Sequence, residues 1–240
     1  MSYDQEVYRS EEYTLADRAS SDVRGEFITK TYVHLFGAIA AFVALEALIL
    51  PLPITAQMVQ WISGSQFSWL AVLGAFMGVS WLANHWAQSD TSVGLQYAGL
   101  GLYVIAEAVI FAPLLFIAAY FGPAGVIPSA AILTGCVFVG LTSIVFFTRR
   151  NFSFLAPFLG ILGFAALGII VCSILFGFNL GILFSGAMVV LAGGYILYTT
   201  SNILHEYRTD QYVAASLALF ASVALLFWYI LRILMSFSRD

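Results

Sequence analysis

The chain has 240 residues, of which 61% are hydrophobic and only 9% are charged, with a formal net charge of −4. A soluble globular protein carries about 25% charged residues, so this composition excludes a water-soluble enzyme. The charges are also unevenly placed, since residues 151–204 contain none and residues 31–148 contain only Glu46, Asp90 and Glu107. Such long uncharged stretches are typical of a polytopic helical protein embedded in a lipid bilayer.

The first 26 residues carry most of the acidic side chains, mixed with arginines. They lack the basic start and apolar core of a signal peptide. We interpret residues 1–26 as a polar cytoplasmic tail and residues 27–240 as a transmembrane bundle. The chain shows no basic patch, so we expect no nucleic-acid partner.

Seven apolar stretches are long enough to cross the hydrocarbon core of a membrane, which takes about 20 residues. They lack the two-residue alternation of a β-barrel, so the predicted fold is all-α with seven transmembrane helices. Short loops make consecutive helices antiparallel neighbours, and residues 52–66 are expected to lie at the membrane interface. The predicted spans are 29–50, 67–87, 93–121, 127–147, 154–176, 180–204 and 211–235.

The basic residues indicate how these spans are oriented. Seven of them fall on the side of the N-terminus, whereas only Arg232 and Arg239 fall on the other side. The positive-inside rule therefore places the N-terminus in the cytoplasm and, after an odd number of spans, the C-terminus outside. An even number of spans with a re-entrant last segment is the alternative. The seven are Arg9, Arg18, Arg24, Lys30, Arg149, Arg150 and Arg208.

Two acidic residues, Glu46 and Glu107, fall inside predicted spans. An ionisable group at that depth costs about 2.5–3.5 kcal/mol on insertion, so it indicates function. Counted from Lys30, Glu46 lies at a depth similar to that of Glu107, and the two could share a proton or bind a cation. The alternative is that each is protonated and hydrogen-bonded to a neighbouring hydroxyl group.

Three histidines fall at the predicted cytoplasmic ends of spans. His34 begins the first span, His85 ends the second and His205 ends the sixth, close to the polar run 198–202. We expect these residues to converge at one level, where protonation near neutral pH could gate the protein. Helix capping or contact with lipid headgroups is the alternative interpretation.

Cys136 and Cys172 lie inside apolar stretches, which favours small packing residues over a disulfide. The sequence contains no metal-ligand spacing, no phosphate-binding loop and no catalytic motif, so we expect no metal, no cofactor and no catalytic residues. The chain is therefore not expected to be an enzyme. Two glycine pairs have the spacing that permits close helix contact: Gly74 with Gly78, and Gly177 with Gly181.

The last two spans carry a more specific pattern. Residues 194–234 read GYILYTTSNILHEYRTDQYVAASLALFASVALLFWYILRIL, and this resembles the C-terminal signature of the Bax inhibitor-1 family. Similar stretches are FITKTYVHLFGAIAAF in the first span, QYAGLGLYVIAEAVIFAPLLF in the third, and AILTGCVFVGLTSIVFFTRRNFSFL across the fourth and fifth. The resemblance covers roughly residues 27–235 and is strongest to bacterial members.

The resemblance implies six helices around a central, C-terminal seventh helix. It also implies a pH-sensitive calcium leak channel, in which an aspartate on helix six and one on helix seven share a proton and latch the cytoplasmic mouth. Two close carboxylates that hold one proton form a workable switch, since gaining or losing that proton changes a helix contact.

This sequence departs from that pattern at the residues that matter most. Thr199 and Ser222 stand at the two aspartate positions, so the di-aspartyl sensor cannot operate here, although two hydroxyls can still hydrogen-bond across the helices. The frequent asparagine of the last helix is Leu225, and the aspartate after the basic residues is Asn151. The second span offers only His85 where the family has an arginine.

Two functional hypotheses follow. The first is a calcium or cation leak protein of the bacterial inner membrane with altered pH gating, in which Glu46, Glu107 and the histidines line or control the path. The second is a non-conducting regulator that contacts other membrane proteins, such as a membrane-anchored protease, through residues 1–26.

Overall fold

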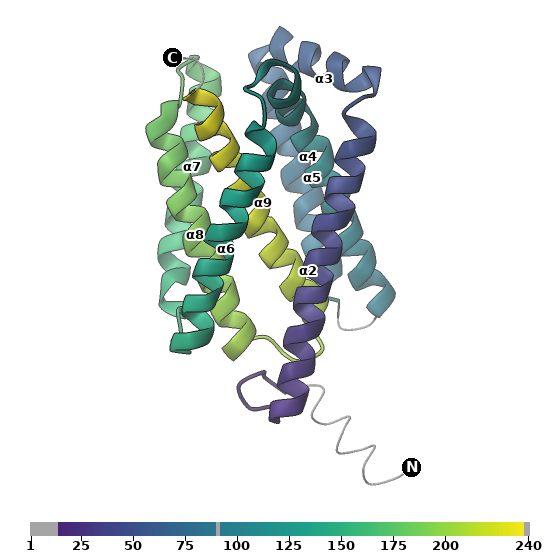
Figure 1. Cartoon of the computed structure of the whole chain (residues 1–240), viewed down its shortest axis with the longest axis vertical. Helices are drawn as coiled ribbons and strands as arrows, with labels where there is room; N and C mark the ends of the chain where they lie inside the picture. The colour runs from purple at the N-terminus through teal and green to yellow at the C-terminus, as the bar shows by residue number, and fades with distance from the viewer. Residues whose placement is uncertain (1–13, 90–91, 238–240) are drawn as a thin grey trace.

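A computed structural model describes residues 14–89 and 92–237, and in these residues the secondary structure is helical apart from one isolated β-bridge. Figure 1 shows the helices packed side by side into an elongated bundle. The elements are α2 (Ser21–Ile49), α3 (Pro53–Gly64), α4 (Gln66–Ala87), α5 (Val93–Phe121), α6 (Val126–Thr148), a 3₁₀ turn (Ser153–Leu155), α7 (Ala156–Phe176), α8 (Gly181–His205) and α9 (Tyr212–Ser236).

The described residues contain seven helices long and apolar enough to cross a membrane, which confirms the predicted number of spans. The predicted boundaries agree with these helices to within a few residues except at the start of α2. The beginning of α2 and the end of α9 lie at opposite ends of the bundle (Figure 1). We call these the N-terminal end and the opposite end.

The first span begins at Ser21, well before the predicted start at residue 29. Asp22 lies in the first turn, where its charge favours the helix dipole, and Glu26 forms an ion pair with Lys30 one turn later at 2.8 Å. Phe27 and Thr31 are already buried on one face of this helix. The boundary expected at residue 26 therefore falls inside α2, because a charged helical turn has the composition of a tail.

Residues 14–20 are also attached to the bundle. Their backbone forms an antiparallel bridge with the loop between α8 and α9, in which the Ala16 amide donates to the Tyr207 carbonyl at 2.9 Å and the Thr209 amide donates to the Thr14 carbonyl at 3.1 Å. Ala16 is completely buried. Residues 1–13 of the predicted tail lie outside the described residues.

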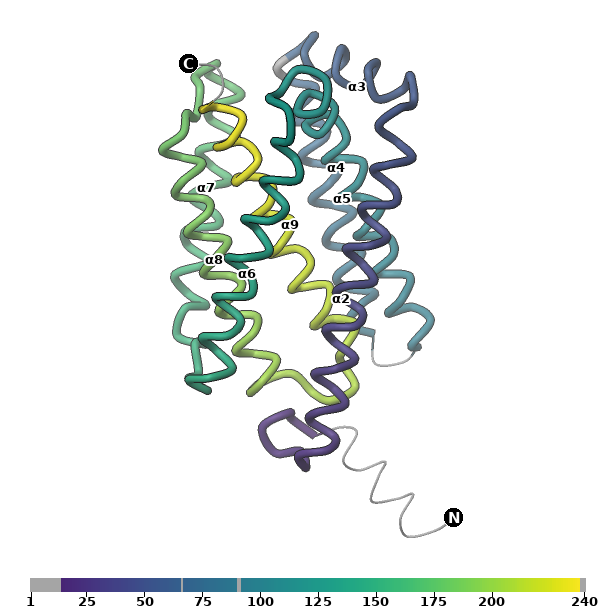
Figure 2. The backbone as a smooth tube through the Cα atoms, viewed as in Figure 1, coloured from purple at the N-terminus to yellow at the C-terminus, as the bar shows by residue number. Residues whose placement is uncertain are grey.

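Helix α9 is the centre of the bundle, as expected. It packs against α2, α4, α5, α6 and α8, and Figure 2 shows it running obliquely between the other helices. Its buried residues occur on all sides of the helix, since Val213 to Leu217 are consecutive and buried. A helix that is apolar all round is one that neighbours enclose.

Helix α3 connects α2 to α4 across the opposite end of the bundle (Figure 1) and packs against α4 and α5. Pro53 fills its first turn, where the missing amide proton costs nothing. The Thr55 hydroxyl donates to the Ile49 carbonyl at 2.7 Å and so caps the end of α2. This is the segment predicted for the membrane interface, and its position in a membrane stays a prediction.

A close helix contact is made at Gly99, which is not one of the glycines with GxxxG spacing. A Cβ atom on Gly99 would lie 2.5 Å from the Ala83 carbonyl oxygen and 2.6 Å from the Ala87 amide nitrogen, so α5 and α4 meet there without a side chain between them. By contrast, the four glycines with GxxxG spacing have no such neighbour: a Cβ on Gly74, Gly78, Gly177 or Gly181 would meet nothing within 4 Å. The close contact that this spacing permits is therefore not made at those pairs.

The two cysteines are free thiols and both are exposed, Cys136 on α6 and Cys172 on α7. The expected lack of a disulfide between them holds, but the expected packing role does not. Both side chains point outward, because an apolar residue in a membrane helix has lipid as an alternative to the protein interior.

Candidate functional site

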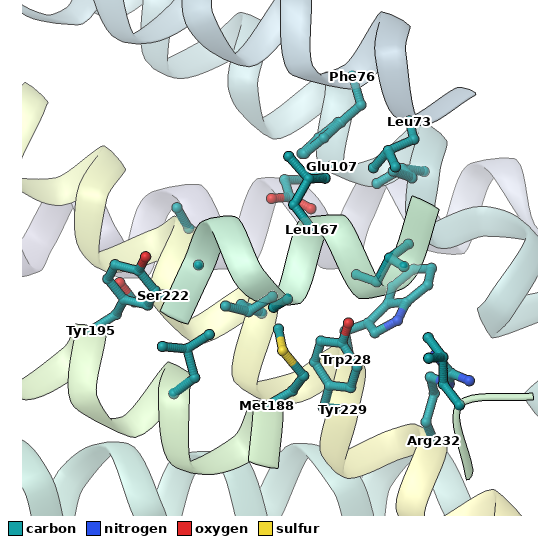
Figure 3. A pocket seen from close by; sticks show the side chains of 18 of the residues that line it. Leu73, Phe76, Glu107, Leu167, Met188, Tyr195, Ser222, Trp228, Tyr229 and Arg232 are labelled. Atoms are coloured by element: carbon teal, nitrogen blue, oxygen red, sulfur yellow. The ribbon is translucent and has the colours of Figure 1, made fainter. Parts of the chain in front are cut away.

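A cavity with a volume of about 660 Å³ lies between α4, α5, α7, α8 and α9. Figure 3 shows its long axis, with Arg232 at one end and Ser222 and Tyr195 at the other. The inner end is closed off, because Glu107, Thr199 and Ser222 are each no more than 6% exposed. The outer end reaches the surface of the bundle, where Phe178 is 47% exposed.

The inner end contains both positions at which the resemblance implied aspartates. Thr199 on α8 and Ser222 on α9 line the same cavity, although they are far apart in the chain. The Ser222 hydroxyl donates to the Ala218 carbonyl of its own helix at 2.8 Å. Within the described residues no hydrogen bond joins Thr199 to Ser222, so the bond that two hydroxyls could make across the helices is not formed.

Among the described residues, Glu107 supplies the one acidic group in the wall of this cavity. It lies half-way along α5, and Figure 3 shows its carboxyl group directed toward the cavity. The Tyr103 hydroxyl, one helical turn earlier, is within hydrogen-bonding reach of this carboxyl group. Phe111 lies one turn later and stacks on Phe227. A carboxyl group in such apolar surroundings can hold a proton or attract a cation.

Arg232 supplies the one basic group in the wall of the cavity, near its outer end. Its guanidinium group lies 5.9 Å from the centre of the Tyr229 ring, which is a cation–π distance. Within the described residues no carboxylate lies within ion-pair distance of it. Asn179, in the exposed loop between α7 and α8, lines the same end of the cavity.

Comparison with known proteins decides the family. The model of a family described as "Inhibitor of apoptosis-promoting Bax1" matches residues 24–239. The chain belongs to the Bax inhibitor-1 family.

Several curated relatives of this family protein match parts of it. Protein LIFEGUARD 3 of Arabidopsis thaliana is 30% identical over 60% of this chain and 59% of its own length. An uncharacterized protein of Pseudomonas aeruginosa is 36% identical over 45% of this chain and 49% of its own length. Bax inhibitor 1 of Schizosaccharomyces pombe is 34% identical over 48% of this chain and 44% of its own length. The match thus spans about half the length of these relatives.

The second buried acid of this Bax inhibitor-1 family protein lies elsewhere. Glu46 is in the last turn of α2, only 4% exposed, and neither carboxyl oxygen has a hydrogen-bond partner among the described residues. It does not line the cavity that contains Glu107. The expected pair of carboxyl groups at one depth is therefore not formed, because α2 ends soon after Glu46 whereas Glu107 is in the middle of α5.

The three histidines all lie in the half of the bundle nearest the N-terminal end, but each contacts a different partner. His34 Nε2 is 2.7 Å from the Tyr97 hydroxyl, and the His34 ring packs on Tyr212, which joins α2 to α5 and α9. His85 is exposed and stacks on Trp81 of its own helix. His205 Nδ1 is 2.9 Å from the carbonyl oxygen of Ser201, one turn earlier. The contacts of His85 and His205 are thus local, whereas His34 links three helices.

Sequence reasoning missed a second polar group, which lies between three helices. The hydroxyls of Tyr32 on α2, Thr142 on α6 and Thr200 on α8 face one another at the N-terminal end of the bundle. All three are buried without a partner at hydrogen-bond distance within the described residues. Single hydroxyls in separate spans carry no mutual signal in one sequence, so this group could not be found without the structure.

Proposed function

We propose that this protein lets cations leak across a membrane, with calcium as the first candidate, and that the cavity between α5, α8 and α9 is part of the path. The observation that carries this proposal is the meeting of Glu107, Thr199 and Ser222 in one cavity wall. The last two are the positions at which the family resemblance implies the acids of a calcium leak channel. Glu107 is then the group that attracts the cation into an otherwise apolar space.

Under this proposal the leak lacks the family's di-aspartyl pH latch. Hydroxyl groups do not titrate near neutral pH, and the Ser222 hydroxyl already bonds within its own helix. We therefore expect Thr199 and Ser222 to add no pH dependence to the flux between pH 5 and 8. Restoring the two acids in the double variant T199D/S222D should introduce a pH dependence, because two carboxyl groups in one cavity share a proton.

The test is calcium flux into liposomes that contain the purified full chain. Glu107→Gln removes the charge at nearly constant volume and should lower the flux by about tenfold, which corresponds to roughly 1.4 kcal/mol in the barrier. Asp22→Asn, at an exposed site in the first turn of α2, is the matched control and should leave the flux unchanged. Equal flux with Glu107→Gln would remove Glu107 from the path, and no flux at any pH would reject conduction.

The location proposed is a bacterial inner membrane with the N-terminal end of the bundle in the cytoplasm. The excess of basic residues near that end supports this orientation. The similarity to bacterial proteins supports a bacterial membrane. Reaction of a cysteine introduced at Arg18 with a membrane-impermeant thiol reagent, in a C136S/C172S background, tests it. Labelling in intact spheroplasts would contradict a cytoplasmic N-terminal end.

A second function, regulation of other membrane proteins by contact, is favoured by one observation. Residues 14–20 bridge to the loop between α8 and α9, so a partner that engages the N-terminal segment would act on both helices of the cavity wall. Deleting residues 1–13 should then abolish capture of a partner while calcium flux stays unchanged. An unchanged set of captured proteins would count against this function.

A further inference from the structure

We propose that the cavity binds one anionic single-chain amphiphile, a fatty-acid carboxylate, with its head on Arg232 and its chain extending inward toward Ser222. Binding does not depend on conduction. Only the consequence, that the chain blocks the cation path, rests on the proposed function.

The middle of the cavity has the chemistry of an acyl-chain site. Between its two polar ends the wall is formed by apolar and aromatic side chains from different helices, including Leu73, Leu167, Ile170, Met188 and Trp228. Figure 3 shows Leu73, Leu167, Met188 and Trp228 around the space between Ser222 and Arg232. An apolar wall of this kind favours an acyl chain, because binding removes the apolar surface of the chain and of the wall from water.

The size of the cavity fits one chain of medium length. Its volume of about 660 Å³ lies well inside the range of about 300–1,000 Å³ usual for sites that bind small molecules. Ser222 and Arg232 are both on α9, and the helix between them rises by about 15 Å. An extended chain of that length reaches from the outer end to the level of the Ser222 hydroxyl group.

At the outer end, no acidic side chain of the described residues pairs with Arg232. Arg232 is partly exposed, faces only the Tyr229 ring, and has no carboxylate at ion-pair distance within the described residues. Asn179 adds an amide group beside it. An arginine guanidinium group binds a carboxylate through two parallel hydrogen bonds, so the charge at this end selects an acidic head.

The outer end is also open to an amphiphile in the membrane surface. Phe178 and Asn179 in the loop between α7 and α8 are both exposed. A fatty acid with its carboxylate at the headgroup level and its chain in the hydrocarbon layer already has the orientation that the cavity requires. A two-chain phospholipid has one chain too many for a single cavity with one cation.

The cavity contains its own optical reporter. The indole rings of Trp69 and Trp228 stack at 6.2 Å and both line the wall. The remaining tryptophans are Trp61, Trp81 and Trp86, so the variant W61F/W81F/W86F leaves only the pair in the cavity. Brominated laurate, added to this variant in phosphatidylcholine nanodiscs, should quench the indole fluorescence in a saturable manner.

Two variants separate the head site from the chain site. Arg232→Gln should weaken binding at least about tenfold, the equivalent of about 1.4 kcal/mol, whereas Arg149→Gln, an exposed arginine at the N-terminal end, should leave the affinity unchanged. Ala221→Leu, which fills the cavity wall, should abolish saturable quenching while Arg232 is intact. Thermal unfolding of each variant shows that it is folded, and Arg232→Lys should retain part of the affinity if Arg232→Gln is unstable.

The proposal fails if Arg232→Gln binds brominated laurate as tightly as the parent variant. It also fails if a brominated dodecyltrimethylammonium ion, which has the same chain and the opposite charge, quenches as well, or if brominated phosphatidylglycerol does. Laurate should lower calcium flux through the parent protein and not through Arg232→Gln. Saturable binding without calcium flux in any variant would reject the leak function and leave the amphiphile site in place.

Discussion

The two ends of the bundle are built differently. At the N-terminal end, hydrogen bonds join segments that are far apart in the chain: residues 14–20 bridge to the loop between α8 and α9, and the Phe152 amide donates to the Ser201 hydroxyl at 2.8 Å. The Ser153 hydroxyl also donates to the Glu206 carboxylate. At the opposite end, the loops 122–125 and 177–180 make no side-chain hydrogen bond to another helix within the described residues.

This difference indicates which end can move. Each intramolecular hydrogen bond contributes about 0.5–1.5 kcal/mol, so the N-terminal end has a local stability that the opposite end lacks. The cavity opens at the end without these bonds. A ligand can therefore enter beside Phe178 and Asn179 without unfolding the part that holds the helices in register.

The largest loss in the free energy of unfolding should come from a substitution at Gly99. Gly99→Ala places a Cβ atom against the backbone of α4, which cannot move aside, so we expect a loss of about 3 kcal/mol in the free energy of unfolding. Gly101→Ala on the same helix meets nothing within 4 Å and is the matched control. Thermal unfolding in detergent measures both, and equal melting temperatures would contradict the close contact.

A smaller loss is expected from Ser201→Ala. Ser201 is completely buried, and without its hydroxyl the Phe152 amide has no acceptor, which costs about 1–3 kcal/mol. Hydrogen exchange of residues 150–155 should rise together with the fall in melting temperature. Asn179→Ala, at the opposite end, should change neither. A fall in stability as large for Asn179→Ala would remove the distinction between the ends.

Arg24→Gln should loosen the N-terminal bridge with a cost of about 1 kcal/mol. The Arg24 guanidinium group donates to the carbonyls of Ala16 and Asp17, both at 2.5 Å, and so holds residues 14–20 in place. We expect faster proteolysis of this segment and faster exchange of the Thr209 amide. Arg18→Gln, an exposed arginine in the same segment, is the control and should leave both rates unchanged.

The smallest effect concerns alkaline pH. Burial, with Tyr198 and Glu206 nearby, raises the pKa of Tyr207 in the loop between α8 and α9 from 10.0 to about 12. The unfolded chain therefore loses this proton at lower pH than the folded loop does. The stability from Tyr207 is fully present below pH 10 and is lost as the pH rises from 10 to 12.

Tyr207→Phe should reduce the fall of the melting temperature between pH 10 and 12. Tyr120→Phe, an exposed tyrosine near the opposite end, should not. Identical pH profiles for the two variants would show that the buried phenol does not couple to folding.

Much of the fold could be predicted from the sequence because hydropathy and length define a membrane span. The spans 93–121 and 127–147 agree closely with α5 and α6. The start of α2 could not be predicted, since charged turns outside the membrane resemble a polar tail. The end of this span was predicted correctly, and it puts Glu46 in the last turn of α2 and away from mid-span.

The candidate site was predictable only where single residues stand out. Glu107 is conspicuous as an acid in an apolar span, and the resemblance singled out Thr199 and Ser222. In the sequence, Arg232 stands out only as one of two basic residues on the side opposite the N-terminus. Its position at the outer end of a cavity depends on how α4, α5, α7, α8 and α9 pack, and one sequence without the structure carries no information on that packing.

The central position of α9 has a consequence for how the protein is made. It follows the other six spans in the chain, so those spans are synthesised before the helix around which they pack. During insertion the nascent bundle has an unfilled axis, and the walls of the cavity are incomplete because α9 supplies one of them. The arrival of α9 thus completes the core and creates the cavity in a single event.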